Sequence, residues 1–156
     1  MKIGIILHSH TGNTLSVGTR LKEAFLASGH FVNLEQVTAV NEDPSAAANV
    51  QLKTIPDTSE YDILVFAAPV RGFSLSPVMN LYLSQISSLN GKKVELFVTQ
   101  HFPHAWMGGN RAIKQIKQVC ESKGAVILKT GVINWTNKQR EQQIVNLIEE
   151  LKNCNF

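Results

Sequence analysis

The chain has few of the features that mark several common functional classes. Its two cysteines, Cys120 and Cys154, are far apart and form no CxxC pair, so neither a disulfide framework nor a zinc site is indicated. No apolar run is long enough for a membrane span, and the opening one is too short for a secretory signal; we expect a cytoplasmic protein. With 44% hydrophobic and 17% charged residues, the chain is typical of one globular domain over residues 1–156.

Several catalytic and binding motifs are also missing. There is no GxxxxGK[ST] phosphate loop, no GxGxxG dinucleotide fingerprint and no GxSxG nucleophile elbow. The most apolar stretch ends in Ala68-Pro69 without an acidic residue, which argues against a phospho-acceptor receiver domain. The net charge of +3 is only mildly basic, so we expect no dedicated nucleic-acid binding. Four histidines near the predicted strand ends lack nearby acidic ligands, so we expect no metal site.

Apolar periodicity alternates between strand-like and helix-like stretches along the chain. Strand patterns cover residues 3–7, 31–37, 61–68, 93–99 and 125–130, and helix patterns cover 12–28, 76–86, 109–123 and 138–152. This alternation predicts an α/β fold with a five-stranded parallel sheet and helices on both faces. Residues 38–59 show little helical period, so the second crossover helix is expected to be short or missing, with one helical turn at 46–49 as a possibility.

The most informative segment is Ser9-His10-Thr11-Gly12-Asn13-Thr14, between the first predicted strand and the first helix. Its hydroxyls and backbone amides lie at the positive end of that helix, and Gly12 lets the backbone approach a ligand closely. Such a loop can hold a phosphate dianion without a lysine or a metal. The alternative is an ordinary helix N-cap, where Ser, Thr and Asn are common.

Two further loops follow the third and fourth predicted strands, whose carboxyl ends share one edge of the sheet. The first is Pro69-Val70-Arg71-Gly72-Phe73-Ser74, in which we expect the proline to end the strand and Gly72 to let a peptide reorient. The second runs from residue 99 to 109 and contributes Thr99, Gln100, His101, Phe102, Trp106 and Gly108. Phe102 and Trp106 could stack on a ring system, with Phe73 as a further candidate. The alternatives are a plain strand-to-helix turn and a loop that packs on its own apolar cluster.

Residues 9–14 resemble the [ST]-x-T-G-x-T phosphate-binding loop of flavodoxins, and the two later loops fall where that family places its flavin-contacting loops. The resemblance covers essentially the whole chain. It implies a flavodoxin-like three-layer sandwich with strand order 2-1-3-4-5, the order known for flavodoxin with FMN. It further implies that residues 9–14 hold the FMN phosphate, and that the flavin lies between residues 71–74 and 101–106. In flavodoxin-like proteins a peptide near the position of Gly72 contacts flavin N5 and can reorient on reduction.

The resemblance thus implies an FMN-binding redox protein that mediates electron transfer with a partner protein. Two alternatives stay open: an NAD(P)H-dependent FMN reductase or quinone oxidoreductase, and a flavin-free interaction module on the same fold. No catalytic residue is expected, because outer-sphere electron transfer needs no protein acid or base. We expect neither nucleic acid nor membrane as a partner, and a monomer or homodimer. The chain departs from the family in its basic charge, since flavodoxins that shuttle electrons are typically acidic.

Overall fold

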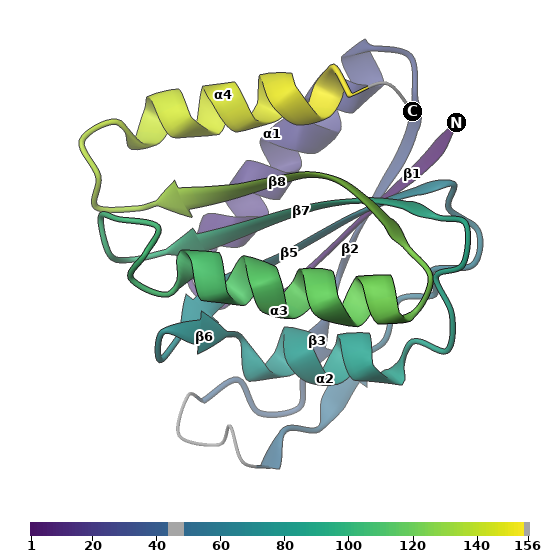
Figure 1. Cartoon of the computed structure of the whole chain (residues 1–156), viewed down its shortest axis with the longest axis horizontal. Helices are drawn as coiled ribbons and strands as arrows, with labels where there is room; N and C mark the ends of the chain where they lie inside the picture. The colour runs from purple at the N-terminus through teal and green to yellow at the C-terminus, as the bar shows by residue number, and fades with distance from the viewer. Residues whose placement is uncertain (44–48, 155–156) are drawn as a thin grey trace.

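Five parallel strands form the central layer of the molecule (Figure 1). The computed structural model describes residues 1–43 and 49–154. The strands are β1 (Lys2–Leu7), β2 (Phe31–Gln36), β5 (Ile63–Arg71), β7 (Lys93–Gln100) and β8 (Val126–Asn134). They lie in the order β2-β1-β5-β7-β8, which is 2-1-3-4-5 when these five are counted along the chain. The predicted fold class and strand order are therefore confirmed.

Helices cover both faces of this sheet. The helices α1 (Asn13–Ala27) and α4 (Arg140–Lys152) lie on one face, and α2 (Pro77–Gln85) and α3 (Gly109–Ser122) lie on the other (Figure 1). Leu21 and Leu147 pack with alternate strand residues in the first layer, and Met79 and Ile116 do so in the second. Because both faces are buried, the central strands read as continuous apolar runs rather than as alternating patterns.

The second crossover contains a small hairpin in place of a helix. The strands β3 (Thr38–Ala39) and β4 (Leu52–Thr54) pair antiparallel, and the Thr38 and Thr54 hydroxyl oxygens are hydrogen-bonded at 2.7 Å. The described residues between β2 and β5 form no α-helix, as expected. The possible turn at 46–49 lies largely outside the described residues.

The expectation that Pro69 ends its strand is wrong. β5 continues through Pro69 to Arg71, and β6 (Ser74–Leu75) then folds back to pair antiparallel with Val70 and Arg71. Pairing of β5 with β1 ends at Ala67, whereas pairing with β7 continues to Pro69. A proline is tolerated there because β1 no longer pairs with β5 at this position. No hydrogen bond of the sheet requires an amide proton on that side.

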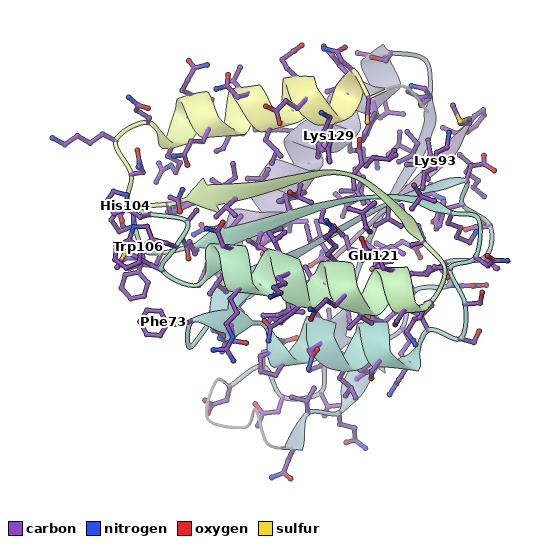
Figure 2. The ribbon with its side chains drawn as sticks, in the orientation of Figure 1. Phe73, Lys93, His104, Trp106, Glu121 and Lys129 are labelled. Carbon is purple, nitrogen blue, oxygen red and sulfur yellow. The ribbon has the colours of Figure 1, made fainter. Side chains whose placement is uncertain are left out.

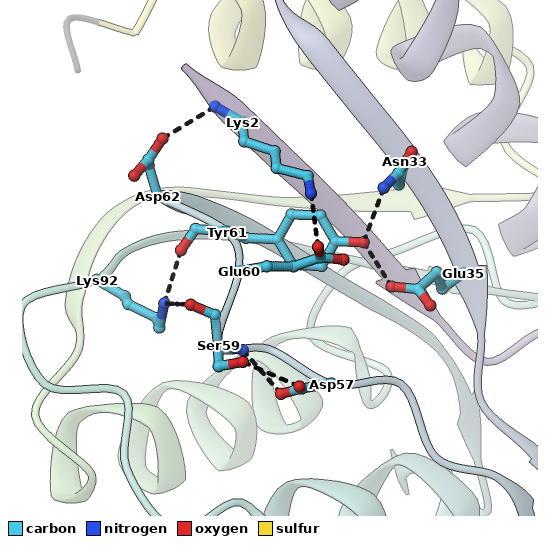
Figure 3. A network of polar contacts seen from close by, with 9 residues as sticks. All are labelled: Lys2, Asn33, Glu35, Asp57, Ser59, Glu60, Tyr61, Asp62 and Lys92. Atoms are coloured by element: carbon cyan, nitrogen blue, oxygen red, sulfur yellow. Dashed lines mark hydrogen bonds and ion pairs between the residues drawn. The ribbon is translucent and has the colours of Figure 1, made fainter.

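A network of polar contacts closes the amino-terminal edge of the sheet, opposite the predicted loops (Figure 3). The Tyr61 hydroxyl donates to Glu35 at 2.6 Å, and the Lys92 ammonium donates to the Tyr61 carbonyl at 2.6 Å. The Tyr61 ring crosses β1 at Gly4, where an added Cβ would lie 2.5 Å from a ring carbon. Burial, followed by the bond to Glu35, raises the pKa of this phenol above its ordinary value. These contacts fix the amino-terminal edge of the sheet.

Candidate functional site

The three predicted loops meet at the carboxyl edge of the sheet around a cavity of about 290 Å³. The cavity is lined by His10, Thr11, Asn13, Pro69, Val70, Arg71, Thr99, Gln100 and His101. All of these residues belong to the predicted binding set, and they come from all three loops. The remaining predicted residues of the set, among them Ser9, Gly72, Ser74 and Gly108, lie on the same three segments.

The first loop presents a run of backbone amides with no protein acceptor. Within the described residues, none of the amides of residues 9–14 donates a hydrogen bond to another group of the chain. The next two are satisfied, since the Leu15 amide donates to Ser9 Oγ at 3.2 Å and the Ser16 amide to the Gly12 carbonyl at 2.9 Å. Gly12 has a φ of 94° and open space where a Cβ would stand. Successive free amides at the start of a helix form a cradle for an anion.

One hydroxyl of this loop bonds another part of the chain, and two others can donate to a ligand in or beside the cavity. Thr14 is buried, and its hydroxyl oxygen is hydrogen-bonded to that of Thr99 at 2.8 Å. This bond ties the start of α1 to the end of β7, and either hydroxyl can be its donor. Ser9 accepts from Leu15 and keeps its own proton to donate, and Thr11 is exposed beside the cavity.

The β5–β6 hairpin carries the one strained non-glycine residue of the described chain. Gly72 and Phe73 form its turn with φ values of 57° and 61°. A two-residue hairpin turn with two positive φ values favours Asn-Gly, and a bulky residue there costs about 1–2 kcal/mol. Gln115 of α3 anchors the hairpin to that helix. Its side-chain oxygen accepts hydrogen bonds from the Ser74 hydroxyl at 3.0 Å and from the Leu75 amide at 2.8 Å. Such strain points to a role for the Phe73 side chain.

The third loop is fixed at its base by Gln100. The Gln100 amide group donates to the His104 carbonyl and to Asn134 Oδ1, both at 2.6 Å, while its Oε1 is buried without a partner among the described residues. At the far end of the loop, Gly108 packs against the backbone of Phe73. The hairpin and the third loop therefore form one continuous wall of the site.

Aromatic rings gather at the rim of this wall. Phe73 and Phe102 stack with ring centroids 5.2 Å apart and planes within 2°, and His104 and Trp106 stack at 6.1 Å and 8°. Trp106 is 74% exposed, Phe73 53% and Phe102 37%. Figure 2 shows Phe73, His104 and Trp106 along the same edge of the molecule. Exposed aromatic rings that are clustered in this way offer stacking surfaces to a planar ligand.

His8 links three segments beneath the site. The His8 Nε2 lies 2.8 Å from a Glu42 carboxylate oxygen, and Nδ1 lies 2.6 Å from Ser76 Oγ, which also accepts from the Met79 amide. Because an ionised carboxylate can only accept, Nε2 carries the proton and the Ser76 hydroxyl donates to Nδ1. Burial lowers the pKa of His8 and outweighs the opposing bond to Glu42. Partial burial resists ionisation of Glu42, but bonds from the Ala39 amide and from His8 leave its pKa below the ordinary value.

Sequence reasoning missed the supporting residues of the site. These are His8, Glu42, Ser76, Gln115 and Asn134. His8 directly precedes the phosphate-type loop and offered a local signal. The partners of the remaining residues are 34 or more positions away, so no sequence pattern connects them.

Residues 1–43 and 49–154 contain neither a membrane-spanning helix nor a cluster of metal ligands. No helix there combines the length and the apolar character needed to cross a bilayer. No group of three or more His, Cys, Asp or Glu side chains there has the arrangement of a metal site.

No family model matches the sequence, and no curated protein matches it either. Solved structures do match the fold over nearly the whole chain. A flavodoxin of Streptococcus pneumoniae TIGR4 has 20% identity and a TM-score of 0.67, with 97% of each chain covered. The two-electron reduced flavodoxin of Megasphaera elsdenii has 20% identity and a TM-score of 0.69, covering 96% of this chain and 98% of that one. A flavoprotein of Lactobacillus acidophilus in complex with FMN has 14% identity and a TM-score of 0.64, covering 91% and 97%. The chain therefore has the fold of the flavodoxins.

Proposed function

We propose that the chain binds FMN at the carboxyl edge of its sheet and acts as an electron-transfer protein. The single observation that carries this proposal is the run of unpaired amides at residues 9–14 beside a cavity whose other walls, at residues 69–71 and 99–101, lead directly into the segments that carry the stacked rings of Phe73 and Phe102. A phosphate group and a planar ring on one ligand would satisfy both features. The FMN-bound Lactobacillus flavoprotein of the same fold supports the choice of ligand.

The residues present fit this cofactor. The free amides and the Ser9 and Thr11 hydroxyls would hold the phosphate, and residues 69–71 and 99–101 would line the path of the ribityl chain. The flavin ring would lie between Phe73 and Phe102. Phe73 and Phe102 are stacked on each other, with ring centroids 5.2 Å apart, so the exposed hairpin tip would have to move away from the third loop to admit the flavin ring between them.

The protein's role in this function is to bind, orient and tune the cofactor. FMN, when bound, supplies one- and two-electron redox chemistry. The tip peptide of the hairpin would contact the flavin, and Gly72 gives that peptide freedom to reorient. Arg71 lines the cavity, and its cation would favour the added negative charge of the reduced state.

The test compares FMN with riboflavin, which lacks the phosphate. Isothermal titration of the purified protein should give an affinity for FMN at least about 100-fold higher, equivalent to roughly 2.7 kcal/mol. Thr11→Asp should weaken FMN binding more than tenfold through charge repulsion and leave riboflavin binding unchanged, an effect of about 1.4 kcal/mol or more. Equal affinities for the two flavins would contradict the proposal.

Two controls complete this test. Thr19→Asp puts the same charge on an exposed position of α1 outside the cavity and should leave both affinities unchanged. Steady-state NADH and NADPH oxidation by the flavin-loaded protein should be negligible without a partner reductase. Rapid turnover would assign the alternative reductase function to the same site.

A further inference from the structure

The surface beside the candidate site lacks negative charge. Between Asp62 and Glu121 the sequence contains a single carboxylate, Glu95. Glu95 is completely buried in β7 beneath the layer of α1 and α4, so it contributes nothing to the surface. This stretch includes the hairpin, the third loop, α2 and nearly all of α3, and its exposed charges are therefore all positive.

Cations of this stretch cluster next to the aromatic rim. Arg111 and Lys114 are exposed on the first two turns of α3, directly after the third loop, and Arg71 directly precedes the turn of the hairpin. Gln115 of the same helix bonds the hairpin, which brings α3 against the rim. Glu121 and its ion pair with Lys117 lie at the opposite end of the helix from Trp106 (Figure 2). We call the surface formed by residues 71–74 and 101–114 the rim face.

Two carboxylates, Glu42 and Asp43, lie on the other side of the hairpin and line a cavity of about 240 Å³ together with Arg71 and Gly72. They offset the charge of Arg71, so the positive charge of the rim face comes chiefly from Arg111 and Lys114 on α3.

The composition of the rim face matches a protein-docking surface. Trp106, Phe73 and Phe102 are exposed large rings, and the exposed Arg111 lies in the first turn of α3, which begins directly after the third loop. Aromatic residues and arginine are enriched at the centres of protein interfaces and carry much of their binding energy. A nucleic-acid interface would need a denser cationic patch than a net charge of +3 provides.

We propose that the rim face docks an acidic protein, with its aromatic rings at the centre of the contact and Arg111 and Lys114 paired with carboxylates of the partner. The inference rests on the proposed function, since docking at this place would bring the partner's redox centre to the exposed edge of the cofactor. Opposite charges steer such a partner to the site and orient it there.

The test uses two haem proteins of opposite charge, acidic cytochrome b5 and basic cytochrome c. The flavin-loaded protein is reduced with dithionite, and stopped-flow absorbance follows the transfer of one electron, which oxidises the flavoprotein and reduces haem iron(III) to iron(II). We expect the rate with cytochrome b5 to fall about tenfold as ionic strength rises from about 20 to 500 mM, because salt screens the attraction. The rate with cytochrome c should rise over the same range.

Charge reversal locates the surface. Arg111→Glu and Lys114→Glu should each lower the cytochrome b5 rate at low salt by about threefold to tenfold and flatten its salt dependence. The matched control is Lys22→Glu on α1, which covers the opposite face of the sheet, and it should have little effect. Isothermal titration with ferric cytochrome b5 measures docking independently of electron transfer, and Trp106→Ala should weaken it at least threefold.

The outcomes separate docking from cofactor binding. An absorption spectrum taken first shows whether FMN is bound, so a protein without flavin contradicts the proposed function while the titration still reports docking. Tighter binding of cytochrome c, a cytochrome b5 rate that rises with salt, or equal effects of Lys114→Glu and Lys22→Glu would each overturn the inference. Binding of phosphatidylserine vesicles in preference to cytochrome b5 would also overturn it.

Discussion

Gly108 lies directly against the backbone of Phe73, and this contact joins the two loops that flank the site. A Cβ on Gly108 would lie 2.8 Å from the Phe73 Cα and 3.0 Å from a Val70 methyl carbon. Gly108 also has a φ of 119°, which side chains rarely tolerate. The close approach of the hairpin to the third loop therefore depends on the absence of a side chain at position 108.

Gly108→Ala should displace the Phe73 backbone from its seat on the third loop, misalign the two ring faces that receive the flavin and so weaken flavin binding. The new methyl group would clash with the Phe73 backbone, which cannot relieve the clash by changing a rotamer as a side chain could. We therefore expect a stability loss of about 1–3 kcal/mol. The displaced aromatic pair should lower FMN affinity by roughly tenfold or more, since stacking on an aromatic ring contributes about 1–3 kcal/mol. Urea unfolding and fluorescence titration with FMN measure the two effects.

Gly91→Ala is the matched control for this variant. Gly91 also has a positive φ, 77°, but it lies in the turn before β7 at the other edge of the sheet, with open space where its Cβ would stand. This variant should lower stability through backbone strain and leave FMN affinity unchanged. Equal losses of affinity in both variants would show that general destabilisation, and not displacement of the Phe73 backbone, is responsible.

Phe73→Asn should separate stability from binding. Asparagine tolerates positive φ and suits the turn, which offsets the lost ring contact with Phe102, so the free energy of unfolding should change by less than about 1 kcal/mol. FMN affinity should fall by about fivefold or more, because one of the two stacking faces is gone. Phe31→Ala, which removes an exposed ring at the start of β2, should leave the affinity unchanged. An unchanged affinity in Phe73→Asn would exclude Phe73 from the flavin site.

The order of elements and the meeting of the three loops at one edge of the sheet were predictable because they depend on local signals. Buried strands read as apolar runs, and Ser76-Pro77 marks the start of α2, where the Ser76 side chain accepts from the Met79 amide as an N-cap does. Gly12 likewise marked the start of α1, where it is the N-cap in a left-handed conformation. Each of these features depends on a few residues that are adjacent in the sequence.

The contacts that organise the site were not predictable, since they join distant parts of the chain. The strand-ending role assigned to Pro69 failed because the cost of a proline depends on whether a neighbouring strand needs its amide, which only the sheet shows. The bond between the hydroxyls of Thr14 and Thr99, which are 85 residues apart, has no local signal either. The bond from His8 to Glu42 likewise spans 34 residues of irregular crossover.

His8 should make the protein lose stability in mild acid. In the unfolded chain His8 takes up a proton near its ordinary pKa of 6.5, whereas burial holds the pKa of the folded group lower. At this position the unfolded state therefore binds more protons below pH 6.5, and the contribution of His8 to the free energy of unfolding falls as the pH drops, by at most about 1.4 kcal/mol per pH unit, while the proton on Glu95 acts in the opposite direction. His8→Gln should be less stable at neutral pH but lack this dependence, as measured by urea unfolding at several pH values. The exposed His101→Gln should keep the wild-type slope, and an unaltered slope in His8→Gln would refute this assignment.

Glu95 should make the free energy of unfolding fall as the pH rises toward about 8. Its carboxylate is buried, and neither oxygen has a hydrogen-bond partner among the described residues. The Cys154 thiol interacts with it electrostatically. Burial raises its pKa from an ordinary 4.5 to about 8, so over this interval the folded state holds a proton that the unfolded state has released. The stability contributed by this proton is complete below the ordinary pKa and is lost as the pH rises to about 8, with a slope of at most about 1.4 kcal/mol per pH unit.

Glu95→Gln tests this assignment because it keeps the shape of the side chain and removes the titration. Between pH 6.5 and 8, above the interval in which His8 acts, the wild-type free energy of unfolding should fall with pH while that of the variant stays level. Glu121→Gln, at an exposed position of α3, should follow the wild type. If Glu95→Gln kept the wild-type slope, the proton would have to be bound elsewhere. A level variant curve would instead show that the layer between β7 and the α1–α4 face tolerates Glu95 only in its neutral form.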